Sequence, residues 1–286
     1  MIPGSEGPDT DDRIVSISNL KFTYEGGVQA LTGLSLDVRK GEYLAIVGGN
    51  GSGKTTLAKV MIGLLKPSNG AVLINGIPVQ GQKVASLARI VGYAFQNPDH
   101  QLFCPTVLEE VRFGPLNLGC SENEQESRVQ RALDAMGLAH VKDRAPFSLT
   151  LSERRRVTIA SVIAMDPQVL ILDEPTTGLD MRESDALMEA VGKLNRDGKT
   201  VILITHDMKL VAKHARRVVV ISEGRVVLDS NPSAVFYDLD ALLRSKLVPP
   251  PVVRLVYRLS SCGVPRDVLS PEQLVDRLMA MRGDVG

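Results

Sequence analysis

The chain has 286 residues, and its 33 lysines and arginines are balanced by 33 aspartates and glutamates, so the formal net charge is zero. This balance excludes a strong electrostatic attraction to nucleic acid or anionic lipid, and the three cysteines show neither metal-ligand spacing nor a paired framework, which suits a reducing cytosol. No apolar run reaches the length of a transmembrane helix, so we expect a soluble protein that acts at a membrane only through a partner.

The first part of the chain predicts a tail followed by a small antiparallel sheet. Residues 1–12 are polar, acidic and rich in Gly and Pro, without the pattern of a signal peptide, so we expect a disordered tail. Apolar and polar residues then alternate in Ile14–Ile17 and in Leu34–Val38, and Ala71–Ile74 repeats the pattern before a turn signal. These three runs predict strands of a sheet that packs on the main body of the protein.

A glycine-rich loop lies between two of these runs. The pattern G-x-x-x-x-G-K-[ST] follows the apolar run Tyr43–Val47, and Thr55–Leu65 continues it with apolar residues at helical spacing. Glycines let backbone N–H groups converge on an anion, and the helix N-terminus adds partial positive charge. The alternative is a turn that binds nothing, but the strand–loop–helix context favours a P-loop for a nucleoside triphosphate. The candidate nucleotide-binding residues are Gly48, Gly49, Asn50, Gly51, Ser52, Gly53, Lys54, Thr55 and Thr56.

Two side chains of the P-loop have more specific predicted roles. Lys54 would reach the β- and γ-phosphates, and the Thr55 hydroxyl would ligate Mg²⁺.

The middle of the chain predicts a helical block and then a parallel sheet. The periodicity is helical from Leu108 to Ala164, most clearly in Glu122–Met136. Short continuous apolar runs of the kind found in buried parallel strands follow, with a helical stretch at Arg182–Asn195. We therefore expect an α/β core with an inserted helical block. The apolar runs are Val169–Leu172, Val201–Ile204 and Val218–Ile221.

Two adjacent carboxylates end the first of these runs. Asp173 at the end of a buried strand beside the P-loop would hold Mg²⁺, directly or through water. Glu174 would face the γ-phosphate, where it could orient or deprotonate the attacking water. The alternative is an Asp-Glu-Pro turn that only caps a helix.

The last part of the chain predicts a linker and two helices. Residues 247–251 contain three consecutive prolines and predict a stiff linker. Val252–Ser260 and Pro271–Met281 predict amphipathic helices of a small terminal module.

From Arg13 to Phe236 these motifs resemble the ATP-binding cassette (ABC) ATPases. The resemblance implies an α/β P-loop NTPase fold over residues 13–246, with an antiparallel β subdomain, an inserted helical subdomain at about 97–164 and a C-terminal helical module at 247–286.

The resemblance also implies roles for single residues. Tyr24 would stack on adenine, although packing on the sheet is an alternative, and Gln96 would sense Mg²⁺ and a membrane partner and act with the catalytic groups. Asp180 would lie in the D-loop at a dimer interface. His206 would hydrogen-bond the γ-phosphate, with a structural histidine as the alternative.

Within this family the segment Phe95–Phe103 and the following Phe113–Gly119 resemble the energy-coupling factor (ECF) importer ATPases, including the cobalt and nickel uptake branch. In that group the C-terminal helices help to hold two ATPases together. His100 is a departure, since the group commonly carries an acidic residue there. The resemblance implies a transmembrane coupling subunit that contacts the chain near Gln96–Phe103.

The signature loop departs further from the family pattern of Leu-Ser-Gly-Gly-Gln. The best register gives Leu149, Thr150, Leu151, Ser152 and Glu153, and a shifted register fits no better. Both glycines are lost, and a leucine would hinder the close approach of backbone N–H groups to a partner's ATP. The alternative is a harmless variant whose side chains turn away. We therefore expect a heterodimer, in which the second ATPase subunit is a different chain with an intact signature loop.

These observations predict the ATP- and Mg²⁺-dependent ATPase subunit of an ECF-type importer for a vitamin or transition-metal ion. It would lie peripherally on the cytoplasmic face of the membrane, with a coupling subunit and a separate substrate-capture membrane protein as partners, and would bind no nucleic acid. One alternative is a regulatory subunit that binds nucleotide and hydrolyses little. Another is a soluble ABC ATPase of DNA repair or translation, although the coiled coils and long insertions of that class are missing from this sequence.

Overall fold

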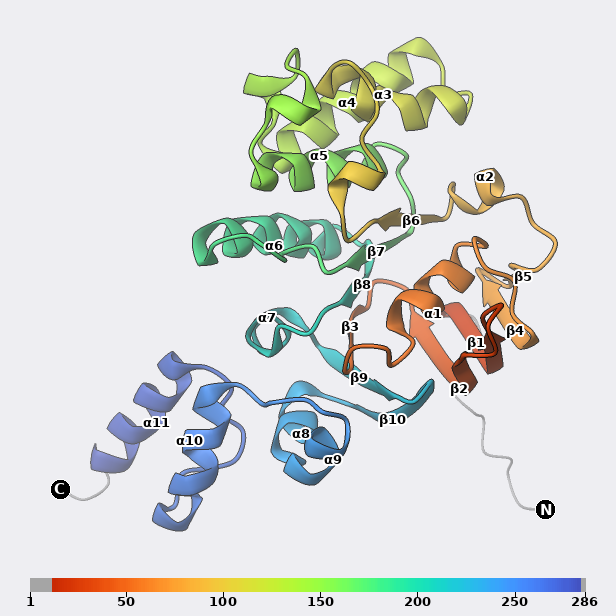
Figure 1. Cartoon of the computed structure of the whole chain (residues 1–286). Coiled ribbons are helices and arrows are strands. Elements are labelled where there is room, and N and C mark those ends of the chain that lie inside the picture. The colour runs from red at the N-terminus through yellow and green to blue at the C-terminus, as the bar shows by residue number, and fades with distance from the viewer. Residues whose placement is uncertain (1–11, 284–286) are drawn as a thin grey trace, which may run out of the picture.

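The computed structural model describes residues 12–283, so the predicted tail lies outside the described residues except for Asp12. Among the helices in this range, none is long and apolar enough to cross a bilayer. Figure 1 shows two sheets near the centre of the molecule, a group of helices above them and further helices toward the C-terminus below.

One sheet within the described range is antiparallel and four-stranded, with strand order β2-β1-β4-β5. It confirms the three strands predicted from alternating residues. Along β1 Val15 and Ile17 are buried two positions apart, as alternation along a strand requires, and a register shift between Ile17 and Leu20 precedes the buried Leu20. The strands are β1 (Arg13–Thr23), β2 (Gln29–Arg39), β4 (Asn69–Ile74) and β5 (Ile77–Pro78).

The other sheet has six strands in this range, in the order β10-β9-β3-β8-β7-β6. The strands from β9 to β6 are parallel, which confirms the predicted parallel core, and β10 pairs antiparallel with β9 at the edge. That edge hairpin was not predicted; its turn residues Glu223 and Gly224 both have positive φ, as tight hairpin turns require. The strands are β3 (Tyr43–Val47), β6 (Val91–Ala94), β7 (Val169–Asp173), β8 (Thr200–Ile204), β9 (Arg217–Ser222) and β10 (Arg225–Ser230).

Helices cover both faces of the six-stranded sheet. Along β8, Ile202 and Ile204 join a core with α1 and the antiparallel sheet, whereas Val201 and Leu203 join a core with α4, α5 and α6. The predicted helices at 122–136 and 182–195 are confirmed by α4 and α6. The helices up to α6 are α1 (Lys54–Met61), α2 (Val84–Leu87), α3 (Val107–Asn117), α4 (Glu122–Met136), α5 (Leu151–Ile163) and α6 (Met181–Arg196).

The C-terminal helices pack on the main body. One buried cluster contains Val47 of β3, Phe236 of α8, Leu247 before α10 and Val253 within α10. Residues on both sides of the expected boundary at 247 therefore share a core. The two predicted terminal helices are confirmed by α10 and α11. The helices in this part are α7 (Met208–His214), α8 (Pro232–Tyr237), α9 (Leu239–Arg244), α10 (Pro251–Leu259) and α11 (Pro271–Gly283). Single 3-10 turns occur at Pro98–His100, Ala139–Val141, Pro146–Ser148 and Ser260–Cys262.

Candidate functional site

The glycine-rich loop joins the end of β3 to the start of α1. Gly51 and Gly53 have φ values of 74° and 106°, a region that side chains with a Cβ rarely adopt. At Gly48 a Cβ would overlap the carbonyl oxygen of Ile221 and the hydroxyl of Ser52. The loop therefore requires glycine at these positions, and it rests directly on the end of β9.

Both sheets support this loop through the β9–β10 turn. The Gly224 amide donates to the Ser52 carbonyl at 3.1 Å, and the Thr32 hydroxyl on β2 donates to the Glu223 carbonyl at 2.8 Å. The shape of the loop therefore depends on segments far from it in the sequence.

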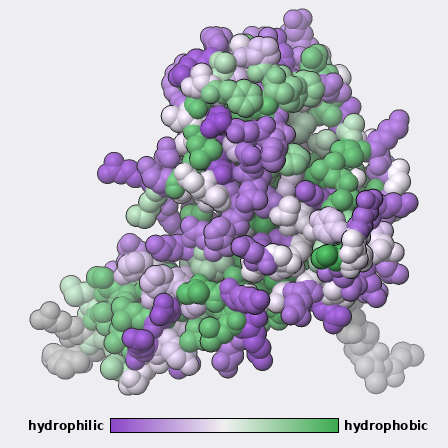
Figure 2. Space-filling model, viewed as in Figure 1, coloured by the Kyte–Doolittle hydropathy of each residue, from purple (hydrophilic) through white to green (hydrophobic). Residues whose placement is uncertain are grey.

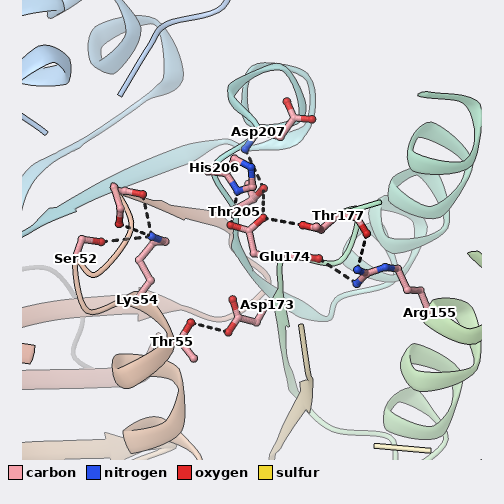
Figure 3. A network of polar contacts seen from close by, with 12 residues as sticks. Ser52, Lys54, Thr55, Arg155, Asp173, Glu174, Thr177, Thr205, His206 and Asp207 are labelled. Atoms are coloured by element: carbon pink, nitrogen blue, oxygen red, sulfur yellow. Dashed lines mark hydrogen bonds and ion pairs between the residues drawn. The ribbon is translucent and has the colours of Figure 1, made fainter. Parts of the chain in front are cut away.

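Lys54 folds back over the loop. Its ammonium donates to the carbonyls of Gly48 at 2.8 Å and Gly49 at 3.0 Å, and lies 3.4 Å from the Ser52 hydroxyl (Figure 3). Burial lowers the pKa of Lys54, and the charges of Glu174 and Asp173 oppose that shift. The Lys54 ammonium thus lies at the centre of the loop, where phosphate oxygens bind in loops of this geometry.

A carboxylate from the neighbouring part of the sheet reaches the start of α1. The hydroxyls of Thr55 and Tyr93 donate to Asp173 Oδ2 at 2.9 Å and 2.8 Å. Asp173 is 1% exposed, and burial is the main cause that raises its pKa. Its Oδ1 has no hydrogen-bond partner among the described residues. A buried carboxylate oxygen left unpaired beside a threonine hydroxyl fits Mg²⁺, which prefers oxygen ligands.

Glu174, next in the chain, lies at the centre of a second group of polar contacts. His206 Nδ1 is 2.7 Å from Glu174 Oε1, and the hydroxyls of Thr205 and Thr177 donate to Oε2 at 3.3 Å and 3.4 Å (Figure 3). Glu174 has φ of 49°, and its amide donates to Ile204 at 2.8 Å. This left-handed conformation is costly for a residue with a Cβ and is typical of functional sites.

The contacts of Thr205, Thr177 and Tyr93 were not predicted from the sequence. Thr205 directly precedes His206 at the end of β8, which was an available signal. Tyr93 gave none, because its contact with Asp173 depends on β6 lying beside β7.

Tyr24 lies beside the start of α1. Its hydroxyl is 2.9 Å from Thr56 Oγ1, and its ring meets Phe22 edge to face at 4.8 Å. The Tyr24 side chain is 42% exposed, so the ring packs on the sheet and also faces solvent near the P-loop. Its role toward adenine stays a prediction.

The loop after β6 is held from α5 rather than from the P-loop. Gln96 is exposed; its carbonyl accepts from Arg155, and no described hydrogen bond joins its side chain to Thr55 or Asp173. Gln101 of the same loop donates to the Thr158 carbonyl at 2.9 Å. The structure therefore does not bring Gln96 into the predicted metal site.

The altered signature loop begins α5. Thr150 and Glu153 form a capping box, in which the Glu153 amide donates to the Thr150 hydroxyl and both Thr150 donors reach the Glu153 carboxylate. The hydrogen bond that the Thr150 amide donates to the Glu153 carboxylate is the main cause that lowers the pKa of Glu153. The Thr150 side chain thus caps the helix that it begins.

Leu151 turns toward its own chain. A Cβ on Gly178 would lie 2.9 Å from Leu151 Cδ2, so this side chain packs against the D-loop. The amides of Leu151 and Ser152 have no hydrogen-bond partner within residues 12–283. The start of α5 therefore has two amides unpaired among the described residues, with Leu151 and Ser152 in place of the two signature glycines.

Asp180 caps α6. Its carboxylate accepts from the Glu183 amide at 2.8 Å, and Glu183 reaches back to the Asp180 amide. Its position at a dimer interface stays a prediction.

Comparisons with known proteins identify the family to which this chain belongs. The family described as ABC transporter matches residues 31–177. The energy-coupling factor transporter ATP-binding protein EcfA of Methanothermobacter thermautotrophicus is 38% identical over 273 residues, which cover 94% of this chain and 88% of that protein. Two relatives from Caldanaerobacter subterraneus subsp. tengcongensis and Methanosarcina mazei are 43% and 42% identical, but the chain spans only 46% and 44% of their lengths.

Solved structures agree with this assignment. CbiO1 from Clostridium perfringens, described as part of the ABC transporter complex cbiONQ, has a TM-score of 0.75 and 38% identity over 88% of this chain and 98% of that chain. The ATP-binding cassette MJ0796, in a dimeric post-hydrolysis state bound to ADP and Pi, has a TM-score of 0.69 and 28% identity over 76% of this chain and 98% of that one. The chain belongs to the ABC transporter ATPase family, with EcfA and CbiO proteins among its relatives.

Proposed function

We propose that this chain is the ATP-hydrolysing subunit of an ECF-type importer that powers uptake of a vitamin or a transition-metal ion. The observation that carries the proposal is the 2.7 Å contact between Glu174 and His206, next to Asp173 and its Thr55 partner. The EcfA and CbiO1 relatives support transport through a multi-subunit complex.

In the proposed reaction the P-loop and Lys54 hold the β- and γ-phosphates, and Thr55 and Asp173 would hold Mg²⁺. Bound there, Mg²⁺ would supply positive charge that neutralises the phosphate oxygens. Glu174 orients water toward the γ-phosphate and accepts its proton, while His206 holds the Glu174 carboxylate and reaches the γ-phosphate.

The proposal includes several partners. The second ATPase subunit is a different chain that keeps both signature glycines, and a transmembrane coupling subunit contacts the surface near Gln96–Phe103. There the rings of Phe103 and Phe113 meet at 4.7 Å and stay 61% and 45% exposed. A separate membrane protein captures the substrate, and the chain lies peripherally on the cytoplasmic face.

The proposed domains follow the same scheme. Residues 13–246 form the ATPase unit, with a helical subdomain at about 97–164, and residues 247–286 form a helical module that supports pairing. Apolar side chains are exposed over the upper helices and over the C-terminal helices at the lower left (Figure 2), where partners would cover them.

The Glu174→Gln variant tests hydrolysis. We expect its ATPase rate, measured with the co-expressed subunits, to fall by about 10²–10⁴-fold, because the water loses its general base, while ATP binding persists. Glu189→Gln, on the exposed side of α6, is the matched control and keeps full activity. An unchanged rate for Glu174→Gln would identify a regulatory subunit instead.

The same variant tests the pairing. Light scattering with Mg-ATP should give a monomer for this chain alone and a dimer once the second ATPase subunit is added. An ATP-dependent dimer of this chain alone contradicts the proposed heterodimer and leaves the hydrolytic role untouched.

A further inference from the structure

A buried arginine joins three segments of the candidate site. Arg155 of α5 is 6% exposed, and its Nη1 donates to the carbonyls of Gln96 at 3.0 Å and Glu174 at 3.2 Å, while Nη2 donates to the carbonyl of Thr177. Figure 3 shows the guanidinium reaching from α5 toward the loops of Glu174 and Thr177. These carbonyls belong to the loop after β6, the end of β7 and the loop before α6.

The surroundings of this guanidinium are unusual for a structural arginine. Among the described residues it has no carboxylate partner, and its Nε is buried without a hydrogen-bond partner. Burial lowers the pKa of Arg155, the charge of Glu174 opposes the shift, and the guanidinium stays charged. The guanidinium donates to backbone carbonyls of three segments, and an apolar residue in its place would leave those carbonyls without this donor.

The neighbouring arginines do not make the same connection. Arg154 pairs with Asp99 of the loop after β6 at 2.6 Å. Arg156 donates to the Met136 carbonyl at 3.3 Å, inside the helical layer. Only Arg155, among these three, touches the loop after β6 and the Glu174 backbone together.

We propose that Arg155 is a positioning residue that couples the loop after β6 to Glu174. The planar guanidinium cannot lengthen, and one nitrogen holds both carbonyls, so a displacement of the Gln96 backbone moves the Glu174 backbone with it. The inference rests on the proposed role of Glu174 in hydrolysis, and it assigns to this chain a link from its partner-facing loop to that carboxylate.

Amide hydrogen exchange on the full chain tests the link itself, without nucleotide or partners. In Arg155→Met we expect exchange to rise by about tenfold or more in both 96–101 and 174–180, because a charge-assisted contact is lost at each. Arg154→Met should raise exchange in 96–101 alone, and Arg156→Met in neither segment. Unchanged exchange in 174–180, or a uniform rise over the whole chain, overturns the proposal.

Kinetics separate positioning from simple stability. We expect Arg155→Met to lower kcat by roughly ten- to a hundredfold with the Kd for ATP unchanged, and Arg155→Lys to recover part of the loss. Arg156→Met is the control and keeps kcat. If Glu174→Gln lowers the hydrolysis rate as expected while Arg155→Met leaves kcat unchanged, this inference fails and the proposed function stands. If the wild-type complex does not hydrolyse ATP, the proposed function fails, and the exchange experiment still decides whether the two segments are coupled.

Discussion

Asp173 shows, at the scale of a single residue, how a binding site can weaken the fold that carries it. Two hydroxyls satisfy one carboxylate oxygen, and the other oxygen is buried without a partner in the described chain. Because the folded protein raises the pKa of Asp173, the free energy of unfolding falls as the pH rises from the ordinary aspartate value to the raised one. Above that raised pKa the ionised Asp173 therefore lowers the free energy of unfolding relative to its protonated form, until a cation compensates the charge.

Replacing the Asp173 carboxylate with an uncharged amide should remove this destabilisation. We expect Asp173→Asn to raise Tm by about 2–4 °C without ligand, since the amide oxygen still accepts both hydroxyls and carries no charge. The same variant should lose most of the stabilisation that Mg-ATP gives the wild type. Thermal unfolding with and without Mg-ATP, and with EDTA added, measures both effects. A lower Tm for Asp173→Asn without ligand would contradict this account.

At the scale of elements, close packing between β6 and α5 fixes the helical layer on the sheet. A Cβ on Gly92 would overlap Val162 of α5 and would lie 3.0 Å from the ring of Pro167. The strand and the helix therefore approach to a distance that only glycine permits.

A methyl group at this position should separate the two elements. We expect Gly92→Ala to lower the free energy of unfolding by about 1–3 kcal/mol, because the added Cβ would press on two buried neighbours, Val162 and Pro167. Urea denaturation gives the value directly.

Gly26→Ala is the matched control for that substitution. Its added Cβ would have no heavy atom within 4 Å and its φ is not positive, so we expect a change within about 0.5 kcal/mol. Equal effects of the two substitutions would show that the contact between β6 and α5 is loose.

The arrangement of the elements also explains which parts of the site could be predicted from the sequence. Lys54, Asp173 and Glu174 were predictable because each follows a buried strand within a short motif. The contacts of Tyr93 and Arg155 were not, since they require the order of β6 and β7 in the sheet and the return of α5 against the loops. Short elements such as α8 and α9 were missed because six residues carry too little periodicity.

At the scale of the whole molecule, the C-terminal helices stabilise the sheet that carries the P-loop. Val253 of α10 is fully buried in the cluster that includes Val47, the residue before the P-loop. We therefore expect α10 to unfold together with β3.

Substitutions at a buried valine and at an exposed valine test this contact between α10 and β3. We expect Val253→Ala to lower the free energy of unfolding by about 1.5–3 kcal/mol, because it removes buried methyl groups. Val248→Ala, at a side chain that is 64% exposed, should change it little. Denaturation followed at two probes, one near the P-loop and one in α10, should show a single transition, and separate transitions would contradict a shared core.

The turn between β9 and β10 also determines when the P-loop can form during synthesis. The Thr32–Glu223 contact links residues 191 positions apart, and Gly224 holds Ser52 across a similar separation. Such distant contacts are slow to form, because a long stretch of chain must close before they are made. A nascent chain that has completed its P-loop motif at Thr56 must therefore extend to Gly224 before the loop gains this support. We therefore expect the P-loop to reach its folded shape only after the β9–β10 turn has been synthesised.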